Sequence, residues 1–280
     1  MPELPEVETI RMGLEKYLVG HKIKDVEVRL RRMVTGDARH VTGAKVTKIE
    51  RFGKGLVIHL DNEHAIAVHI KLTGQLIYRG PNTPKNQMVS KTKVGTIPNK
   101  FTHVIFHLDS GGTLYYNDLR QFGWIKIVKE DEVSKLPFFK ELGPEFMKDL
   151  TLERFAEILL KFGSPVKAVI MAQQRMSGVG NIYANDGLYL AGIDPRRKAK
   201  SLSEDEVKKL YESILEVLKK GLKYGGASEL SYVNALGEEG GYQEHFLVYG
   251  KEKEQCHKGH PIKKIKIVGR GTYFCERCQK

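Results

Sequence analysis

The chain opens with Met1-Pro2-Glu3-Leu4-Pro5-Glu6-Val7-Glu8-Thr9. If Met1 is removed, Pro2 becomes a secondary amine at the chain end, and an α-amino group with a pKa of about 8 is partly an uncharged nucleophile near neutral pH. Such an amine attacks a sugar C1′ or an aldehyde to give a cationic iminium, an electron sink for elimination chemistry. Glu3 stands beside it to transfer protons. The alternative is structural: Pro5 starts a helix, and the acidic residues stabilise its N-terminus.

Beyond this stretch the apolar pattern changes twice. Helical spacing over residues 5–18 gives way to many short β-type runs over 23–128, which predict a β-sandwich or barrel. Helical patterns return from 151 to 224, and the tail is β-like with all three cysteines. We therefore expect a multidomain α+β protein, divided into an N-terminal β-sandwich domain with its helix (1–130), a linker (131–150), a helical domain (151–244) and a cysteine module (245–280).

The charge balance is strongly basic. Forty-six Lys and Arg residues against 34 Asp and Glu give a formal net charge of +12 over 280 residues. This favours a polyanionic partner, most simply nucleic acid, over a merely soluble basic protein. We find no apolar run long enough to span a membrane and no signal-peptide pattern. Three clustered cysteines are too few for a secreted disulfide framework and fit a reducing cytoplasm.

Residues 178–184 read Gly-Val-Gly-Asn-Ile-Tyr-Ala between two helical patterns. A glycine turn that opens a helix exposes backbone N–H groups at the positive helix end, where a phosphate binds well. An ordinary helix–turn–helix connection explains the same residues, with glycine ending one helix and Asn181 capping the next. Local sequence does not separate these two interpretations.

The opening stretch resembles the start of the formamidopyrimidine-DNA glycosylase family, bacterial enzymes that excise oxidised purines. The resemblance continues in the family's order through Lys54, residues 69–74, 118–123 and 178–184, and the cysteine-bearing tail. Leu4 separates the chain from the sister endonuclease VIII group, which usually has Gly there. The resemblance spans nearly the whole chain and implies a helix–two-turn–helix domain for residues 151–244 and a zinc-finger-like β-hairpin for 245–280.

The resemblance also implies roles for five residues in catalysis and lesion contact. Pro2 attacks C1′ of the damaged nucleotide, Glu3 moves protons, and Glu6 orders water and the N-terminal helix. Lys54 matches a lysine that grips a phosphate beside the flipped nucleotide. Lys167 matches a lysine that faces the lesion.

Three further matches concern the DNA backbone. Asn181 matches a phosphate-binding Asn, and Arg270 matches the hairpin-tip arginine beside the phosphate that flanks the lesion. His103 is retained as a phosphate neighbour, although the preceding Lys-Phe-Thr departs from the usual Lys-His-Asp. Asp186 replaces the usual Glu, so the capping geometry around it stays open.

An enzyme that acts on a base in a duplex must flip it out and fill the gap. In the family, Leu72 falls where a Met wedge is common, Arg120 faces the widowed cytosine, and Phe122 inserts beside it. The structural alternative places Leu72 and Phe122 in the β core and makes Arg120 a surface ion-pair partner. The glycine-rich loop over residues 225–242 resembles a segment that caps flipped 8-oxoguanine, which favours purine lesions; otherwise it is a mobile surface loop.

The tail contains Cys256, His257, His260, Cys275 and Cys278. The family has two Cys-x2-Cys pairs here that hold one structural zinc, and the first pair of this chain lacks its second Cys. Zinc requires four tetrahedral N or S ligands, so we expect Cys256, His260, Cys275 and Cys278, with His257 as the weaker candidate for the imidazole. The alternative is a hairpin that packs without metal.

Together these features predict a bifunctional DNA glycosylase and apurinic/apyrimidinic lyase for oxidised purines, which acts through a Pro2 iminium and β,δ-elimination. Its partner is double-stranded DNA with damaged bases, and it is expected to be a monomer that works at the nucleoid in the cytoplasm. Two alternatives remain: a glycosylase of the same fold for oxidised pyrimidines or abasic sites, and a non-enzymatic protein that binds damaged DNA.

Overall fold

The computed structural model describes residues 1–280 and divides into two compact units. Unit 1 contains Met1–Lys140 and Leu222–Gln243; unit 2 contains Glu141–Gly221 and Glu244–Lys280. The expected helical domain over 151–244 differs from this division, because its last part packs with unit 1. The expected linker over 131–150 differs too, since its first ten residues belong to unit 1. Both differences come from contacts between residues far apart in sequence.

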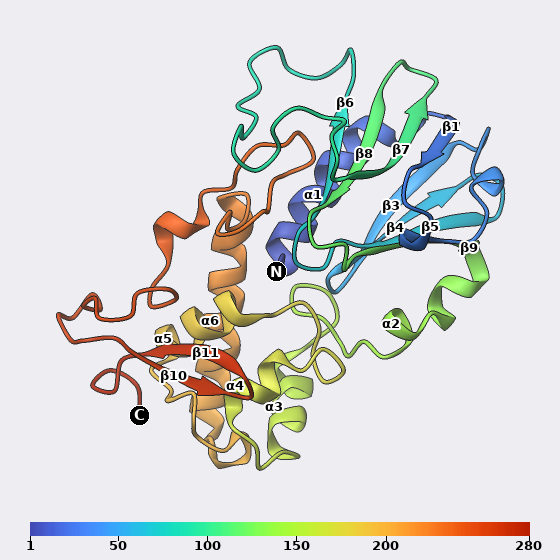
Figure 1. The fold of residues 1–280 in the computed structure, drawn as a ribbon. Helices are drawn as coiled ribbons and strands as arrows, with labels where there is room; N and C mark the ends of the chain where they lie inside the picture. The colour runs from blue at the N-terminus through green and yellow to red at the C-terminus, as the bar shows by residue number, and fades with distance from the viewer. The chain divides into compact units, whose positions relative to one another are not determined.

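Unit 1 is a sandwich of two mostly antiparallel sheets, coloured blue to green in Figure 1. One sheet has the strand order β1-β7-β8-β6, and the other has the order β2-β9-β5-β4-β3. The strands are β1 (Ile23–Val28), β2 (Val34–Thr35), β3 (Val46–Phe52), β4 (Gly55–Leu60), β5 (His64–His69), β6 (Gly74–Arg79), β7 (Thr102–Leu108), β8 (Thr113–Asp118) and β9 (Trp124–Lys129).

The period-2 pattern of the strands builds the core between the sheets. In β4, Leu56 and Ile58 point into this core with side chains of helix α1 (Leu4–Leu18), whereas Val57 points to the opposite face. That outer face is covered by the 3₁₀ segment Glu130–Lys135 and helix α2 (Pro137–Lys140). Strand β4 is therefore apolar on both faces, and the start of the predicted linker becomes part of the sandwich.

Unit 2 combines helices with a two-stranded hairpin. Helix α5 packs against α4 and against hairpin strand β11. The helices are α3 (Leu152–Leu160), α4 (Val166–Met171), α5 (Asn181–Ala191) and α6 (Glu204–Lys223), and the hairpin strands are β10 (Lys263–Ile267) and β11 (Arg270–Phe274). The predicted α+β class, with a sandwich and a C-terminal hairpin, is confirmed. None of the six α-helices combines the length and apolarity needed to cross a membrane.

Candidate functional site

The start of α1 buries two carboxylates beside Pro2. The Glu3 N–H donates to Glu6 Oε2 over 2.7 Å, while the Glu3 carboxylate accepts the Glu6 N–H in a reciprocal cap. The other Glu6 oxygen accepts the Ala227 N–H at 2.8 Å. Pro2 is buried, and Met1 before it is 43% exposed. The structure thus brings Pro2, Glu3 and Glu6 together and adds Ala227, which the sequence did not single out.

Lys54 is buried in the turn between β3 and β4, and an ion pair ties this turn to α1. Arg51 Nε lies 2.7 Å from Glu8 Oε2. Lys54 also acts on His69: burial, together with the charges of Lys71 and Lys54, lowers the His69 pKa to about 3. His69 is therefore a neutral imidazole at physiological pH, and its Nδ1 accepts the Lys71 N–H at 2.9 Å.

A buried aspartate organises the end of the four-stranded sheet. Asp118 accepts the Thr73 hydroxyl, the Arg120 N–H at 3.2 Å and the Gly123 N–H at 2.8 Å. Thr73 in turn accepts the Arg120 N–H at 2.9 Å. The turn before β6 and the turn after β8 are thereby locked to each other. Neither Thr73 nor Asp118 was given a role from sequence, although both lie inside the quoted motifs.

This lock brings Leu72, Arg120 and Phe122 to the same end of the sheet. Phe122 is 55% exposed and Leu72 is half-buried, so the alternative that placed Phe122 in the β core is wrong. The Arg120 guanidinium lies 4.6 Å from the centre of the Phe122 ring, a cation–π distance. Gly123 makes the turn possible, because a Cβ there would lie 1.9 Å from Tyr116 Oη.

His103 lies beneath the same turn rather than on the surface. It is 4% exposed, and its Nε2 lies 2.8 Å from the Asp118 carbonyl, to which it donates. This bond supports the segment that carries Arg120. A phosphate contact by His103 stays a prediction.

In unit 2 a buried lysine joins α4 to the hairpin. Lys167 is 1% exposed, and its ammonium donates to Asn185 Oδ1, the Gly271 carbonyl and Thr272 Oγ1 at 2.7 to 3.1 Å. Asn185 also accepts the Tyr273 N–H at 2.8 Å. Lys167 therefore fixes the strand that begins at Arg270, and Asn185 is a positioning residue that the sequence analysis missed.

A turn of glycines leads into α5, as the sequence predicts. Gly178 adopts φ +96°, Gly180 is the cap residue without a side-chain cap bond, and Asn181 is the first helical residue. The cap residue is therefore Gly180, one position before Asn181, which the alternative interpretation predicted as the cap. The Asn185 amide donates to the Asn181 carbonyl at 2.5 Å, within the first turn of the helix.

Asp186, the departure from the family pattern, has a clear structural role. It is fully buried, and its carboxylate accepts the N–H groups of Leu247, Val248 and Tyr249 at 3.0 to 3.1 Å. Aspartate thus caps the segment that leads into the cysteine module. The open question about this position is resolved: the shorter carboxylate reaches three amides.

Four side chains in the tail converge on one point. Ligand atoms of Cys256, His260, Cys275 and Cys278 all lie within 4.8 Å of one another. Zn–S bonds of about 2.3 Å at tetrahedral angles place two sulfurs about 3.8 Å apart. The Cys256 and Cys278 sulfurs are 3.7 Å apart, and His260 Nδ1 is 3.3 Å from the Cys278 sulfur. The set fits one structural zinc, whereas His257 instead contacts Tyr189.

The thiol chemistry of this cluster also suits a cation. Burial raises the Cys256 pKa, but hydrogen bonds from Tyr189 and from backbone amides outweigh it and lower the value to about 6. Burial and the sulfurs of Cys275 and Cys256 raise the Cys278 pKa to about 11. Sulfurs packed this closely resist carrying several negative charges together. A zinc ion among them compensates those charges.

The hairpin tip presents Arg270 on a tight turn. Val268 and Gly269 both have positive φ, at +47° and +71°, which makes this a type I′ turn. Val268 is 77% exposed, and Arg270 is exposed at the start of β11. The predicted tip arginine is therefore at the tip and accessible.

Family models match three successive parts of the chain. They are the formamidopyrimidine-DNA glycosylase N-terminal domain over residues 1–125, the H2TH domain of the same family over 142–232, and a zinc finger found in FPG and IleRS over 259–280. Among solved structures, a Lactococcus lactis FPG mutant in complex with Fapy-dG-containing DNA is 35% identical, covers 100% of both chains and has a TM-score of 0.87.

Curated relatives agree over the full length. The formamidopyrimidine-DNA glycosylase of Streptococcus mutans is 37% identical over 100% of both chains, and that of Pelotomaculum thermopropionicum is 36% identical over 100% of this chain and 99% of its own. These matches cover the sandwich, the helical unit and the cysteine hairpin. This chain belongs to the formamidopyrimidine-DNA glycosylase family.

Proposed function

We propose that the protein is a bifunctional DNA glycosylase and apurinic/apyrimidinic lyase that removes oxidised purines from duplex DNA. The observation that carries this proposal is the buried N-terminus, where Pro2 is flanked by the reciprocal cap of Glu3 and Glu6. A secondary amine held there, once Met1 is removed, has two carboxylates within one helical turn for proton transfer. The net charge of +12 suits the DNA partner.

The chemistry proceeds in balanced steps. The Pro2 lone pair forms a bond to C1′, the glycosidic bond breaks, and the departing base takes a proton. Glu3 is assigned to take the N–H proton of the attached amine and to protonate O4′, so that the C1′–O4′ bond breaks, the sugar opens and the iminium forms. Loss of a C2′ proton breaks the C3′–O bond, loss of a C4′ proton breaks the C5′–O bond, and water then releases the amine. Glu6 holds the Glu3 N–H throughout.

The remaining predicted residues are assigned to DNA contact. Contacts to phosphates or beside the lesion are assigned to Lys54, Asn181, His103 and Arg270. Lys167 supports them by fixing the strand that begins at Arg270. Leu72 and Phe122 fill the gap left by the flipped base, and Arg120 addresses its former partner. The choice of purines rests on the presence of the glycine-rich loop over residues 225–242. A Lactococcus lactis FPG complex is described with oxidised pyrimidine DNA, so pyrimidine lesions are the second candidate substrate. We place the protein at the nucleoid, as a monomer.

Borohydride trapping tests the function directly. The protein is incubated with duplexes carrying 8-oxoguanine, thymine glycol or an abasic site, and sodium borohydride is added. With borohydride, we expect a covalent adduct that joins Pro2 to the DNA. Without borohydride, we expect cleavage products that carry a phosphate on both sides of the gap. Tight binding of all three duplexes without any adduct would show a non-enzymatic damage-binding protein instead.

Arg120→Ala is expected to weaken discrimination of the base opposite the lesion, with little effect on cleavage of single-stranded abasic DNA. A good side-chain contact to a base edge gives roughly 1–3 kcal/mol of discrimination, which is about 5- to 150-fold in rate ratio. Cleavage rates on four duplexes that differ only in the opposite base measure this. Arg31→Ala, at an exposed arginine of the same unit, is the matched control. Equal losses on single and double strands would assign Arg120 to folding.

A further inference from the structure

The connection between β6 and β7, residues 80–101, contains no helix or strand of its own. Loops longer than about 15 residues without secondary structure are uncommon in compact domains and usually have a function. This connection runs along the glycine-rich loop. The Ser90 N–H donates to the Gly237 carbonyl at 2.9 Å, and Val94 packs with Ile77 and Val233.

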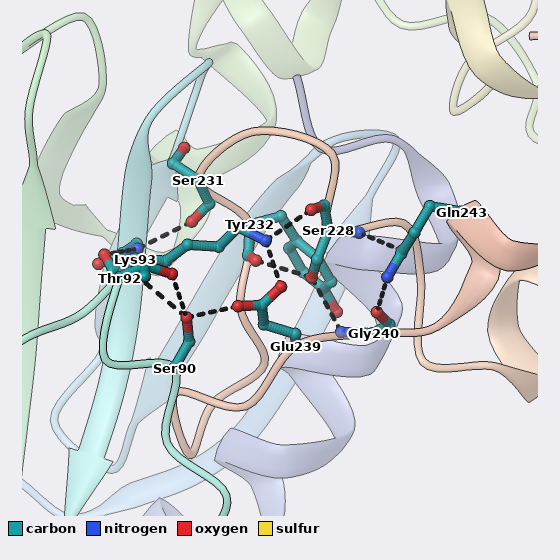
Figure 2. A network of polar contacts seen from close by, with 10 residues as sticks. Ser90, Thr92, Lys93, Ser228, Ser231, Tyr232, Glu239, Gly240 and Gln243 are labelled. Atoms are coloured by element: carbon teal, nitrogen blue, oxygen red, sulfur yellow. Dashed lines mark hydrogen bonds and ion pairs between the residues drawn. The ribbon is translucent and has the colours of Figure 1, made fainter. Parts of the chain in front are cut away.

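Three side chains clamp the two loops together, and we call Ser90, Lys93 and Glu239 the Lys93 clamp. The Lys93 ammonium forms an ion pair with Glu239 and donates to the Ser228 carbonyl at 2.7 Å (Figure 2). The Ser90 hydroxyl donates to the other Glu239 oxygen at 2.5 Å. A single ammonium group thus holds both arms of the glycine-rich loop.

The clamp fixes the outer part of the loop around an exposed tip. Lys93 holds the Ser228 carbonyl before the tip, and Gln75 holds the Ser231 carbonyl after it at 2.8 Å. Gln75 also donates to the Lys93 carbonyl at 3.0 Å, so the two residues that bind the ends of the tip also bind each other. Between them Glu229 and Leu230 are exposed, Leu230 by 57%. A stem with both ends tied thus presents a two-residue tip to solvent.

The inner part of the loop is held without the clamp. Ala227 forms an isolated β-bridge with Gly241, and the Tyr242 N–H donates to the Gly226 carbonyl at 3.0 Å. This inner part supplies the Ala227 N–H to Glu6. Ser228 and Ser231 also keep hydrogen bonds to Gln243, Tyr232 and Leu72 that do not involve Lys93. Loss of Lys93 therefore loosens the outer part of the loop at the Ser228 carbonyl and at Glu239, while the bond to Glu6 keeps its own support.

We propose that Lys93 is a positioning residue that holds the tip of the glycine-rich loop against a damaged base, so that base release depends on the clamp and elimination at an abasic site does not. The inference rests on the proposed glycosylase function. A tip can act on a base only where a base is present. The amine and its two carboxylates, anchored through Ala227, serve both substrates.

Lys93→Met separates the two activities, since it keeps the length of the side chain and removes its donors. We expect release of 8-oxoguanine in single turnover to fall by on the order of 10-fold or more, because small misplacements of substrate-positioning groups are costly. Cleavage of an abasic duplex should stay within about two-fold. Lys91→Met, at an exposed lysine two positions away, removes the same charge and should match the wild type on both substrates.

Two further variants keep the inference testable if Lys93→Met folds poorly. Lys93→Arg restores the charge and should recover part of the base-release rate, and Ser90→Ala should lower that rate alone by a smaller factor. A Glu-specific protease should cut at Glu229 faster in Lys93→Met than in the Lys91 control. Equal losses on both substrates, or an unchanged base-release rate, would overturn the clamp. Failure of the wild type to form any borohydride adduct would overturn the function itself.

Discussion

Pro2→Gly is expected to lower strand cleavage at a damaged base by on the order of 100-fold or more, because it replaces the secondary amine on which the iminium depends. A proline nitrogen gives a permanently cationic iminium, whereas a primary amine gives an imine that must be protonated first. The ring also fixes the amine at the buried entrance of α1, beside Glu3 and Glu6. Single-turnover cleavage of an 8-oxoguanine duplex, with intact mass recorded for each preparation, measures the loss.

Pro5→Ala is the matched control for Pro2→Gly, since Pro5 is the second proline of the same helix start and carries no free amine. Its thermal unfolding midpoint separates a weakened helix from a lost nucleophile. A chain that retains Met1 should behave like Pro2→Gly, because its Pro2 nitrogen is an amide. Full activity in a preparation whose intact mass includes Met1 would refute the role of Pro2.

The second large effect concerns the zinc ligands. Protein purified without added metal should hold one zinc per chain, and His260→Ala should weaken zinc binding more than about 100-fold, because even partners of the ligands cost 10- to 100-fold. His257→Ala should keep the metal, since His257 lies outside the converging set. Elemental analysis and competition with a chelator measure both variants.

Zinc removal should disorder the hairpin and leave the rest of the protein folded. The hairpin carries Arg270, so chelation should reduce DNA affinity while the helical signal in circular dichroism and the sandwich persist. Strands β10 and β11 belong to the same cysteine module as the zinc ligands, whereas the core of unit 1 contains no residue of that module. Well under one zinc per chain with full DNA affinity would mean that the hairpin is held by packing alone.

Sequence alone predicted much of the fold, because local patterns report local burial. The short apolar run of β4 and the helical spacing of α1 both predict residues of the core that the structure shows. Exposure of Phe122 was not decidable in this way, since an aromatic residue near a strand usually enters the core. It is exposed because Asp118 locks the turn on which it stands, through bonds to residues up to 45 positions away.

The same physical reason explains what was missed. The Lys93 ammonium and the Ser228 carbonyl are 135 positions apart, and Glu6 is 221 positions from Ala227. No periodicity or spacing encodes such pairs. The set Cys256, His260, Cys275 and Cys278 was predicted because the family's zinc hairpin needs four donors. The structure brings these four together, while His257 lies outside them.

Unit 1 is discontinuous in sequence, and this has a consequence for biosynthesis. The ribosome completes Met1–Lys140 and the whole first part of unit 2 before it adds Leu222–Gln243. A nascent chain that stops early has the proposed nucleophile Pro2 but lacks the Ala227 amide that donates to Glu6. Fragments released by stalled translation should be poor nicking agents.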